Sequence, residues 1–306
     1  RQHMTHQKVE NNLQHQPQIS KYEKFEIIYK KLKHIFIGFF TILTCTLIIL
    51  LAITVFYFQS ITKESEHISD NTLRLKLLNI PGTQDINYSN QHILSEYNQS
   101  LNPLIVGPKN VNKNIIKALT ASEDSLFYRH NGILPKALLR AVGQDLFNTD
   151  AATGGSTITQ QLVKNQVLTN EKTYDRKANE LVLSMRAENL LTKDEIIYTY
   201  LNIVPFGRDY NGANISGISS ASYSLFGKPP SEVNIAESAY LIGLLQSPYY
   251  YTPYQEDGVL KPDDQIQIGI NRQHYVLKRM LVEKKITQHE FNQSEKFDIK
   301  KHLMTK

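Results

Sequence analysis

The sequence predicts a mainly α-helical protein with one membrane-spanning helix ahead of a globular domain, on three observations. Apolar residues recur at helical spacing over most of the chain after residue 108. Strand signals are weak there, and no internal repeat occurs at the periods typical of solenoids. One stretch near the N-terminus is apolar throughout. The 306 residues suffice for one large domain or two small ones with an ample core.

The apolar stretch runs from Ile35 to Phe58 and contains 24 residues without a charge. As a helix it would be about 36 Å long, at about 1.5 Å per residue, which is enough to cross a bilayer. A buried core helix would need protein on every side, and a signal peptide has a shorter apolar region followed by a cleavage site of small residues. The sequence therefore predicts a transmembrane helix over residues 35–58.

Charge indicates how this helix is oriented. Basic residues precede it, whereas the flank that follows mixes both signs, so the positive-inside rule predicts a cytoplasmic N-terminus and an extracytoplasmic remainder. We expect residues 1–34 to be a mostly disordered cytoplasmic tail, whose residues 1–3 before Met4 look like the remnant of a tag. The basic residues are Lys21, Lys24, Lys30, Lys31, Lys33 and His34.

Net charge and cysteine content exclude two classes of function. The formal net charge is +5, but much of the excess lies in juxtamembrane lysines that suit an anionic inner leaflet, so we expect no nucleic acid partner. Cys45 is the only cysteine and lies inside the predicted span. The extracytoplasmic part therefore has no disulfide and no cysteine nucleophile.

A stalk and a helical domain are expected after the span. Residues 59–107 are expected to form the stalk, with short helix or strand pieces, and the globular domain is expected over 108–290. Thr192 and Glu195 form a capping box at the start of one helix. Residues 291–306 are expected to begin a linker or a C-terminal tail. Helices beyond the first are predicted over 135–147, 156–168, 174–191, 193–202, 216–226, 231–246 and 264–283.

Three polar stretches in this domain carry candidate chemistry, and the first is "ASEDSLFYRHNGI", residues 121–133. Glu123 and Asp124 end a helical pattern there, and His130 precedes a glycine turn. Burial at the end of an apolar helix raises the pKa of a carboxyl group, which suits a general base. The same residues also fit a solvated helix end and a satisfied turn histidine, and this segment alone favours that interpretation.

The second stretch is "GGSTITQQLVKN", residues 154–165. It opens with two glycines, continues with hydroxyls and amides, and has no charge before Lys164. It fits a glycine-opened turn into an ordinary helix, and equally the polar floor of a site for a large anion. A helix N-terminus at this place would favour a bound phosphate.

The third stretch, residues 172–191, is predicted to be a helix. Glu180 lies three residues after Lys177 and four after Arg176, so its carboxylate has cationic neighbours on its own face. Such pairs at a surface contribute only a few tenths of a kcal/mol. Taken with Lys172 and the other two stretches, however, the glutamates and cations suit a sugar whose leaving group is a phosphate.

In this order and spacing, "EDSLFYRHNGI", "GGSTITQQLVKN", "RKANE" and "KDEIIYTYLN" resemble the motifs of the peptidoglycan glycosyltransferases of family 51, found in class A penicillin-binding proteins and monofunctional transglycosylases. The resemblance covers about residues 105–255. It implies a lysozyme-like, mostly helical fold with a jaw that dips into the membrane. The implied reaction polymerises lipid II, a disaccharide-pentapeptide on undecaprenyl diphosphate, with inversion at C1 of the donor MurNAc.

The resemblance also implies roles for single residues. Glu123 falls on the general base that takes a proton from the 4-hydroxyl of the acceptor GlcNAc, with Asp124 as its neighbour. Glu180 falls on a second essential carboxylate near the diphosphate, for which Mg²⁺ or Mn²⁺ is a candidate cofactor. Residues expected to bind the donor sugar and its diphosphate are Ser156, Thr157, Gln160, Gln161, Lys164, Asn165, Lys172, Arg176 and Lys177. Other motif positions are Phe127, His130, Gly132, Gly154, Gly155, Glu195, Tyr200 and Asn202.

The chain departs from the family pattern at three places. Lys172 stands where many relatives carry arginine, which keeps the charge without the planar grip on phosphate. Leu134 occupies an acidic position after the "HNGI" turn, and "FGRDYNGANISGISSASYSLF" is longer and more polar than its counterpart. The jaw is expected at 134–152, whose apolar face fits an interfacial helix and a core helix alike.

Two rival functions fit parts of this pattern. A lysozyme-like hydrolase would use the two glutamates but would leave the cations without a role. A catalytically silent anchor would bind lipid-linked glycan and recruit other proteins without turnover. For the enzyme, the expected partners are lipid II, the growing glycan strand, membrane lipids and cell-wall synthesis proteins.

Overall fold

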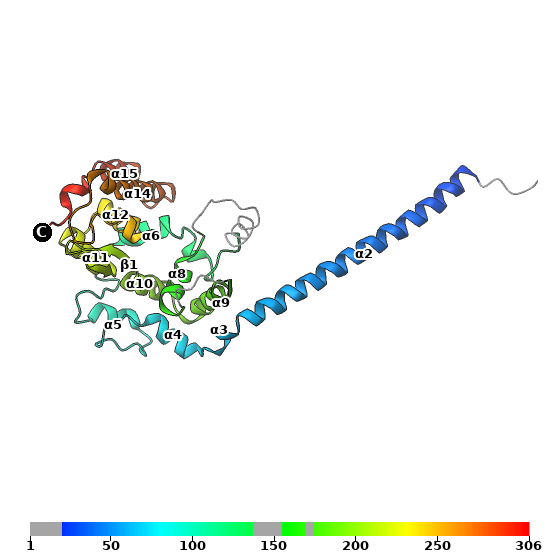
Figure 1. Ribbon diagram of the computed structural model, residues 1–306, viewed down its shortest axis with the longest axis horizontal. Coiled ribbons are helices and arrows are strands. Elements are labelled where there is room, and N and C mark those ends of the chain that lie inside the picture. Colours follow the sequence, from blue (N-terminus) through cyan, green and yellow to red (C-terminus); the bar gives the residue numbers. More distant parts are fainter. Residues whose placement is uncertain (1–19, 137–154, 169–173, 306) are drawn as a thin grey trace, which may run out of the picture. The chain divides into compact units, whose positions relative to one another are not determined.

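The computed structural model describes residues 20–136, 155–168 and 174–305. The chain divides into two compact units, residues 1–60 and 61–306, and each is described by itself. Helices dominate the described parts of both units, which confirms the predicted mainly α fold (Figure 1). Most of the segment expected as the jaw lies outside the described residues.

Helix α2 (Lys21–Ile61) forms the described part of the first unit. Ser20 and Glu23 cap its start, since the Glu23 amide donates to Ser20 Oγ (3.2 Å) and the Ser20 amide donates to Glu23 Oε2 (2.8 Å). The helix therefore contains the predicted span and begins well before it, within the segment expected as a disordered tail. Among the described residues, α2 is the one helix long and apolar enough to cross a membrane.

The threonine hydroxyl groups inside the apolar part of α2 are satisfied within the helix. Each donates to a backbone carbonyl four residues earlier, at 2.7 to 3.0 Å. Such bonds suit a lipid environment, where no water is present to bind a free hydroxyl. The residues are Thr41, Thr44, Thr46 and Thr54.

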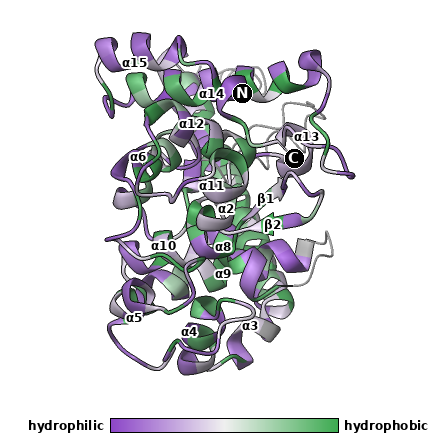
Figure 2. Ribbon diagram, turned by 90° about the vertical axis from the view of Figure 1, so that its left-hand side faces the viewer, coloured by the Kyte–Doolittle hydropathy of each residue, from purple (hydrophilic) through white to green (hydrophobic). Residues whose placement is uncertain are grey.

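Two groups of packed helices form the core of the second unit (Figure 1). They are α6 (Lys113–Ser122), α12 (Ile235–Leu244) and α14 (Asp263–Val282) in one group, and α8 (Ile158–Gln166), α9 (Tyr174–Leu190) and α10 (Lys193–Ile203) in the other. Every residue of α12 from Ala236 to Leu244 is buried. Hydrophilic and hydrophobic residues both occur along α14 in Figure 2, because one face of that helix meets the core. Helices α8, α9, α10, α12 and α14 lie close to their predicted ranges.

Residues 61–107 belong to the same compact unit, although the sequence suggests a separate stalk. They include α3 (Lys63–His67), α4 (Asp70–Leu78) and α5 (Ile93–Gln99). Leu77 on α4 and Tyr97 on α5 are fully buried in the common core. The Tyr97 hydroxyl also donates to Leu78 O (3.1 Å) and shares a hydrogen bond with Thr199 on α10 (2.9 Å). Packing and hydrogen bonding therefore place the folded domain's start ahead of residue 108.

Shorter elements complete the unit. They are η1 (Phe127–Arg129), β1 (Pro205–Arg208), β2 (Asn214–Ser216), α11 (Ile218–Phe226), α13 (Pro248–Tyr251), α15 (Gln288–Glu295) and η2 (Ile299–His302). Strands β1 and β2 form an antiparallel hairpin with a bulge before Gly207, within the segment that departs from the family pattern. Ile299 and Leu303 are buried in the core, so the segment expected as a tail packs against the domain.

Leu77→Ala tests whether residues 61–107 contribute to the folded domain. The side chain is fully buried, so its truncation should lower the free energy of unfolding by about 2–5 kcal/mol. Leu101→Ala is the matched control, because Leu101 is exposed. Chemical unfolding followed by circular dichroism measures both variants. Equal free energies of unfolding for the two would contradict the shared core.

Candidate active site

Helix α6 places Glu123 at the edge of the core. Asn112 caps the start of the helix, where its side chain accepts a hydrogen bond from an amide of the first turn (2.9 Å). Ile115, Ala118 and Leu119 are buried, so one face of the helix is fixed against its neighbours. Glu123 follows the last helical residue as the C-cap, and its amide donates to Leu119 O (2.9 Å).

Both oxygens of the Glu123 carboxylate accept a hydrogen bond. Gln161 Nε2 donates to Oε2 and Arg272 Nη2 donates to Oε1, each at 3.4 Å. The side chain is 14% exposed. Burial raises the pKa of Glu123 above its ordinary value, Arg272 and Gln161 oppose this shift, and the charge of Asp124 adds to it. A carboxylate in this environment is suited to accept a proton.

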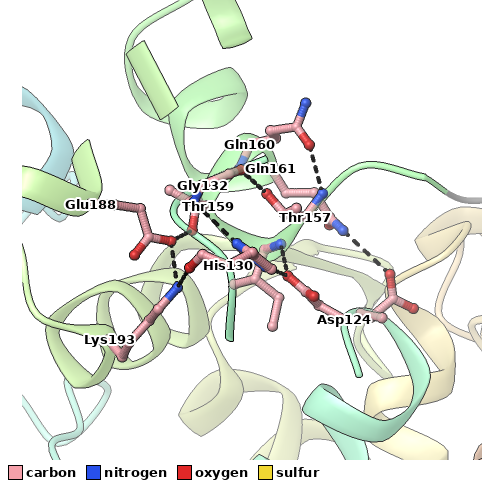
Figure 3. A network of polar contacts seen from close by, with 11 residues as sticks. Asp124, His130, Gly132, Thr157, Thr159, Gln160, Gln161, Glu188 and Lys193 are labelled. Atoms are coloured by element: carbon pink, nitrogen blue, oxygen red, sulfur yellow. Dashed lines mark hydrogen bonds and ion pairs between the residues drawn. The ribbon is translucent and has the colours of Figure 1, made fainter. Parts of the chain in front are cut away.

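The neighbouring Asp124 is bound in a buried network (Figure 3). Its Oδ2 accepts from His130 Nε2 (2.8 Å) and from the amide of Ile158, the first residue of α8 (3.1 Å). His130 Nδ1 accepts from the Gly132 amide (3.0 Å), so the neutral ring carries its proton on Nε2. Asp124 thereby supplies the anion at the N-terminus of α8, where the sequence suggests a phosphate.

The turn before Gly132 and the start of α8 are joined a second time. Thr157 Oγ1 donates to Gly132 O (2.6 Å) and accepts from the Gln160 amide (3.1 Å), while Gln160 Oε1 accepts from the Thr157 amide (2.9 Å). Gly132 has a φ of +88°, and a Cβ there would lie 2.5 Å from Ser184 O on α9. Only glycine fits this crossing without strain.

Glu188 on α9 takes part in a third connection between α8 and the turn before Gly132 (Figure 3). Its Oε1 accepts from Thr159 Oγ1 (2.6 Å) and from Lys193 Nζ (2.7 Å). Lys193 Nζ also donates to His130 O (2.7 Å). The carboxylate of Glu188 therefore connects α9 to α8 and α10, and Lys193 connects both to the turn.

Glu180 on α9 is a further buried carboxylate of the candidate site, with a side chain that is 3% exposed. Its Oε1 accepts from Gln160 Nε2 (3.3 Å) and from the ammonium group of Lys177. The same ammonium donates to Ser156 Oγ (3.2 Å). Four of the sequence-predicted residues are thus brought together around the start of α8.

Neighbouring glutamines of α8 connect the two glutamates. Gln161 contacts Glu123, whereas Gln160 contacts Glu180. Successive side chains on a helix of 3.6 residues per turn point about 100° apart, so two adjacent residues can serve two separate partners. Tyr200 Oη donates to Gln161 Oε1 (2.8 Å), which turns the amide nitrogen toward Glu123.

Among the remaining expected donor-binding residues and the two motif glycines, those that the structure describes differ in exposure. Lys164 and Asn165 are exposed in the last turn of α8, Arg176 is half-buried on α9, and Gly155 is half-buried before α8. Outside the described residues lie Gly154 and Lys172.

Three further motif residues support the fold around the site. Phe127 is fully buried. Glu195 and Thr192 form the predicted capping box of α10, which is confirmed. Asn202 binds both backbone groups of Val106, accepting from its amide (2.9 Å) and donating to its carbonyl (2.8 Å), and so ties α10 to the segment before α6.

Arg272, which contacts Glu123, is a site residue that the sequence does not reveal. It lies on α14, which is predicted as a helix, but 149 positions separate it from Glu123. Arginine on an amphipathic helix is ordinarily a surface residue. Nothing in the pattern distinguishes it from Arg279 on the same helix, which pairs with Glu283 (2.6 Å).

Few side chains in the part of the chain that the structure describes are arranged to bind a divalent cation. No three His, Cys, Asp or Glu side chains are grouped there to hold a metal ion. Glu180 Oε1 already accepts from Lys177 and Gln160. These residues by themselves therefore do not form a site of the kind that Mg²⁺ requires.

Gly132→Ala tests whether the turn must cross α9 at close range. A Cβ would meet Ser184 O at 2.5 Å, so we expect the free energy of unfolding to fall by about 1–3 kcal/mol. Gly82→Ala is a matched control, because Gly82 has a similar φ of +81° and no atom within 4 Å of an added Cβ. Thermal unfolding of both variants measures the difference. If Gly82→Ala destabilises as much as Gly132→Ala, the close crossing has no effect.

Comparison with known proteins identifies the family. A family model described as transglycosylase matches residues 90–281, which include both glutamates and Arg272. The chain is 39% identical to penicillin-binding protein 1A of Escherichia coli (strain K12) over 181 residues, which are 59% of this chain and 20% of that protein. It is 35% identical to penicillin-binding protein 1A of Clostridium botulinum over 208 residues, 66% of this chain and 24% of that protein. It thus spans about a fifth to a quarter of the length of these relatives. The chain belongs to the transglycosylase family and carries its lysozyme-like, mainly helical domain.

Proposed function

We propose that this chain is a peptidoglycan glycosyltransferase that joins lipid II units into β-1,4-linked glycan strands during bacterial cell-wall synthesis. The observation that carries the proposal is a pair of glutamates, one buried and one largely buried, held by adjacent glutamines of α8, with the Lys177 ammonium bound to the buried Glu180. Membership of the transglycosylase family supports the same activity.

In the proposed reaction Glu123 is the general base. Its carboxylate takes the proton from the 4-hydroxyl of the acceptor GlcNAc while that oxygen forms a bond to C1 of the donor MurNAc. The bond from C1 to the diphosphate oxygen breaks on the opposite face, and its electron pair leaves with undecaprenyl diphosphate. One in-line displacement therefore converts an α-linked donor into a β-1,4 linkage, with inversion.

Lys177 is the cation proposed to receive the charge that develops on the leaving diphosphate. Its side chain is 39% exposed, whereas its partner Glu180 is buried, so the ammonium can meet a ligand while it remains fixed by the protein. A cation held in place before the reaction stabilises the transition state more than the ground state. Lys164, Lys172 and Arg176 complete the proposed set of cations.

The membrane helix fits a substrate that stays in the bilayer. In the proposal α2 anchors the protein, with the N-terminus in the cytoplasm and the catalytic domain outside, where membrane lipids and other cell-wall synthesis proteins would be its partners. No step passes through a metal ion. Whether Mg²⁺ or Mn²⁺ is needed is measured by adding each ion, or a chelator, to the polymerisation assay.

Glu123→Gln is expected to reduce polymerisation by a factor of about 10²–10⁴, because the amide cannot accept the proton. Purified protein in detergent with fluorescent lipid II, and products separated on a gel, provides the measurement. The proposal is wrong if the variant polymerises as well as the parent. Shortened glycan strands with untouched lipid II would indicate a hydrolase instead, and binding without turnover would indicate a silent anchor.

We also predict how kcat/KM of the parent protein depends on pH in the same assay. Because burial raises the pKa of Glu123 above its ordinary value of 4.5, the ionised base is present above this raised pKa and is lost as the pH falls through it. The acid limb of the kcat/KM profile should therefore lie above pH 4.5. A limb at or below that value would show that Glu123 is solvated in the free enzyme.

Lys177→Gln should lower kcat by a factor of about 10², because a fixed charge that acts in the transition state is removed. Lys278→Gln is the matched control, since Lys278 is exposed on α14. Single-turnover rates with lipid II measure both variants. Equal kcat values for the two would exclude Lys177 from charge stabilisation.

A further inference from the structure

We propose that Arg272 is a positioning residue for Glu123: its guanidinium is the counter-charge and the hydrogen-bond donor that keep this largely buried carboxylate ionised and oriented for catalysis. This inference rests on the proposed role of Glu123 as the general base. It extends the site to α14, whose residues carry no role in the proposed reaction so far.

The pair is placed where a charge interaction is effective. Arg272 Nη2 lies 3.4 Å from Glu123 Oε1, and the two side chains are 13% and 14% exposed. Helix α14 packs against α6, and Glu123 is the C-cap of α6, so both partners are held by packed core helices. Solvent screens a pair at this depth much less than a surface pair.

Arg272 is itself held from two sides. Its guanidinium lies over the ring of Tyr275, with 4.3 Å between the guanidinium carbon and the ring centroid. Its aliphatic stem passes Gly243 on α12, where an added Cβ would lie 3.3 Å from Arg272 Cγ. A long side chain fixed at its stem and at its planar end loses little further freedom when it orients a carboxylate.

The other groups that face Glu123 do not replace this charge. Gln161 on α8 donates to the second oxygen, and Tyr200 on α10 stands behind it, but both are neutral. Asp124 is a like charge beside Glu123 and raises its pKa. Arg272 is the cation among these groups, so it is the one that opposes burial.

Removal of the guanidinium therefore has a defined direction. Burial raises the pKa of Glu123 and Arg272 lowers it, so without Arg272 the pKa rises further and the base is protonated over a wider range of pH. The acid limb of the kcat/KM profile should move to higher pH by about 1 unit or more. A residue with a purely structural role would lower activity without moving this limb.

The test measures kcat/KM against pH for the full chain in detergent with fluorescent lipid II. Arg272→Gln should shift the acid limb upward, whereas Arg272→Lys, which keeps the charge, should return it toward the parent position with a lower kcat. Lys278→Gln removes one charge from the exposed face of α14 and should leave the profile unchanged. Circular dichroism melting establishes that each variant is folded, and Arg272→Met, which keeps the packing of the stem, replaces Arg272→Gln if the latter is not.

The possible results separate this inference from the proposed function. An acid limb that coincides in Arg272→Gln and the parent overturns the role of Arg272, while Glu123→Gln remains inactive. If Glu123→Gln retains full polymerisation, the general base has been assigned wrongly, whatever Arg272 does. An upward shift in Arg272→Gln that Arg272→Lys reverses supports both.

Discussion

The attachment of the α8 N-terminus to the turn before Gly132 is the constraint on which the rest of the site depends. The carboxylate of Asp124 accepts from the first amide of α8 and from His130 in one buried network. A negative charge at this end of a helix is stabilised by the helix dipole and by amides that have no partner within the helix. Because Thr157 and Glu188 fix the same helix from other sides, α8 has one orientation against α6 and α9.

The orientation of α8 gives Glu123 and Glu180 different surroundings. Adjacent glutamines, Gln160 and Gln161, reach one glutamate each, so the polar run at the start of α8 connects two carboxylates of unlike surroundings. Glu180 is in direct contact with an ammonium group. Glu123 instead has a more distant guanidinium and a neutral amide, which leave its pKa raised by burial. Carboxylates in contrasting environments are typical of sites where each performs a different task.

The sequence predicts the elements that are long and periodic. Helices α8, α9 and α10 lie close to their predicted ranges, and the capping box of Thr192 and Glu195 is a local pattern that needs no tertiary information. Helix α5 has 7 residues, and strands β1 and β2 have 4 and 3, which is too short for a periodic signal. Their place in the domain is decided by contacts with distant helices.

The site residues also divide into those that local sequence predicts and those that depend on contacts between distant helices. Glu123 and Glu180 stand out because their motifs are contiguous in sequence, whereas Arg272 reaches Glu123 only through the packing of α14 on α6. Gln161 is expected to bind the donor, yet its amide points to Glu123, because the direction of a side chain depends on a partner such as Tyr200 that spacing does not specify. The motifs therefore predict which residues belong to the site. Which of these residues contact each other depends on the packing of the helices.

Direct titration of Glu123 tests the burial of the base most directly. Glutamate labelled with ¹³C at the carboxyl carbon, incorporated into the full chain in detergent, gives a resonance for Glu123 that is assigned by its loss in Glu123→Gln. We predict that this resonance titrates with a midpoint above 4.5, the ordinary value, because the side chain is buried between α6, α8 and α14. A midpoint at or below 4.5 would contradict a buried base and, with it, the assembly of this site around α8.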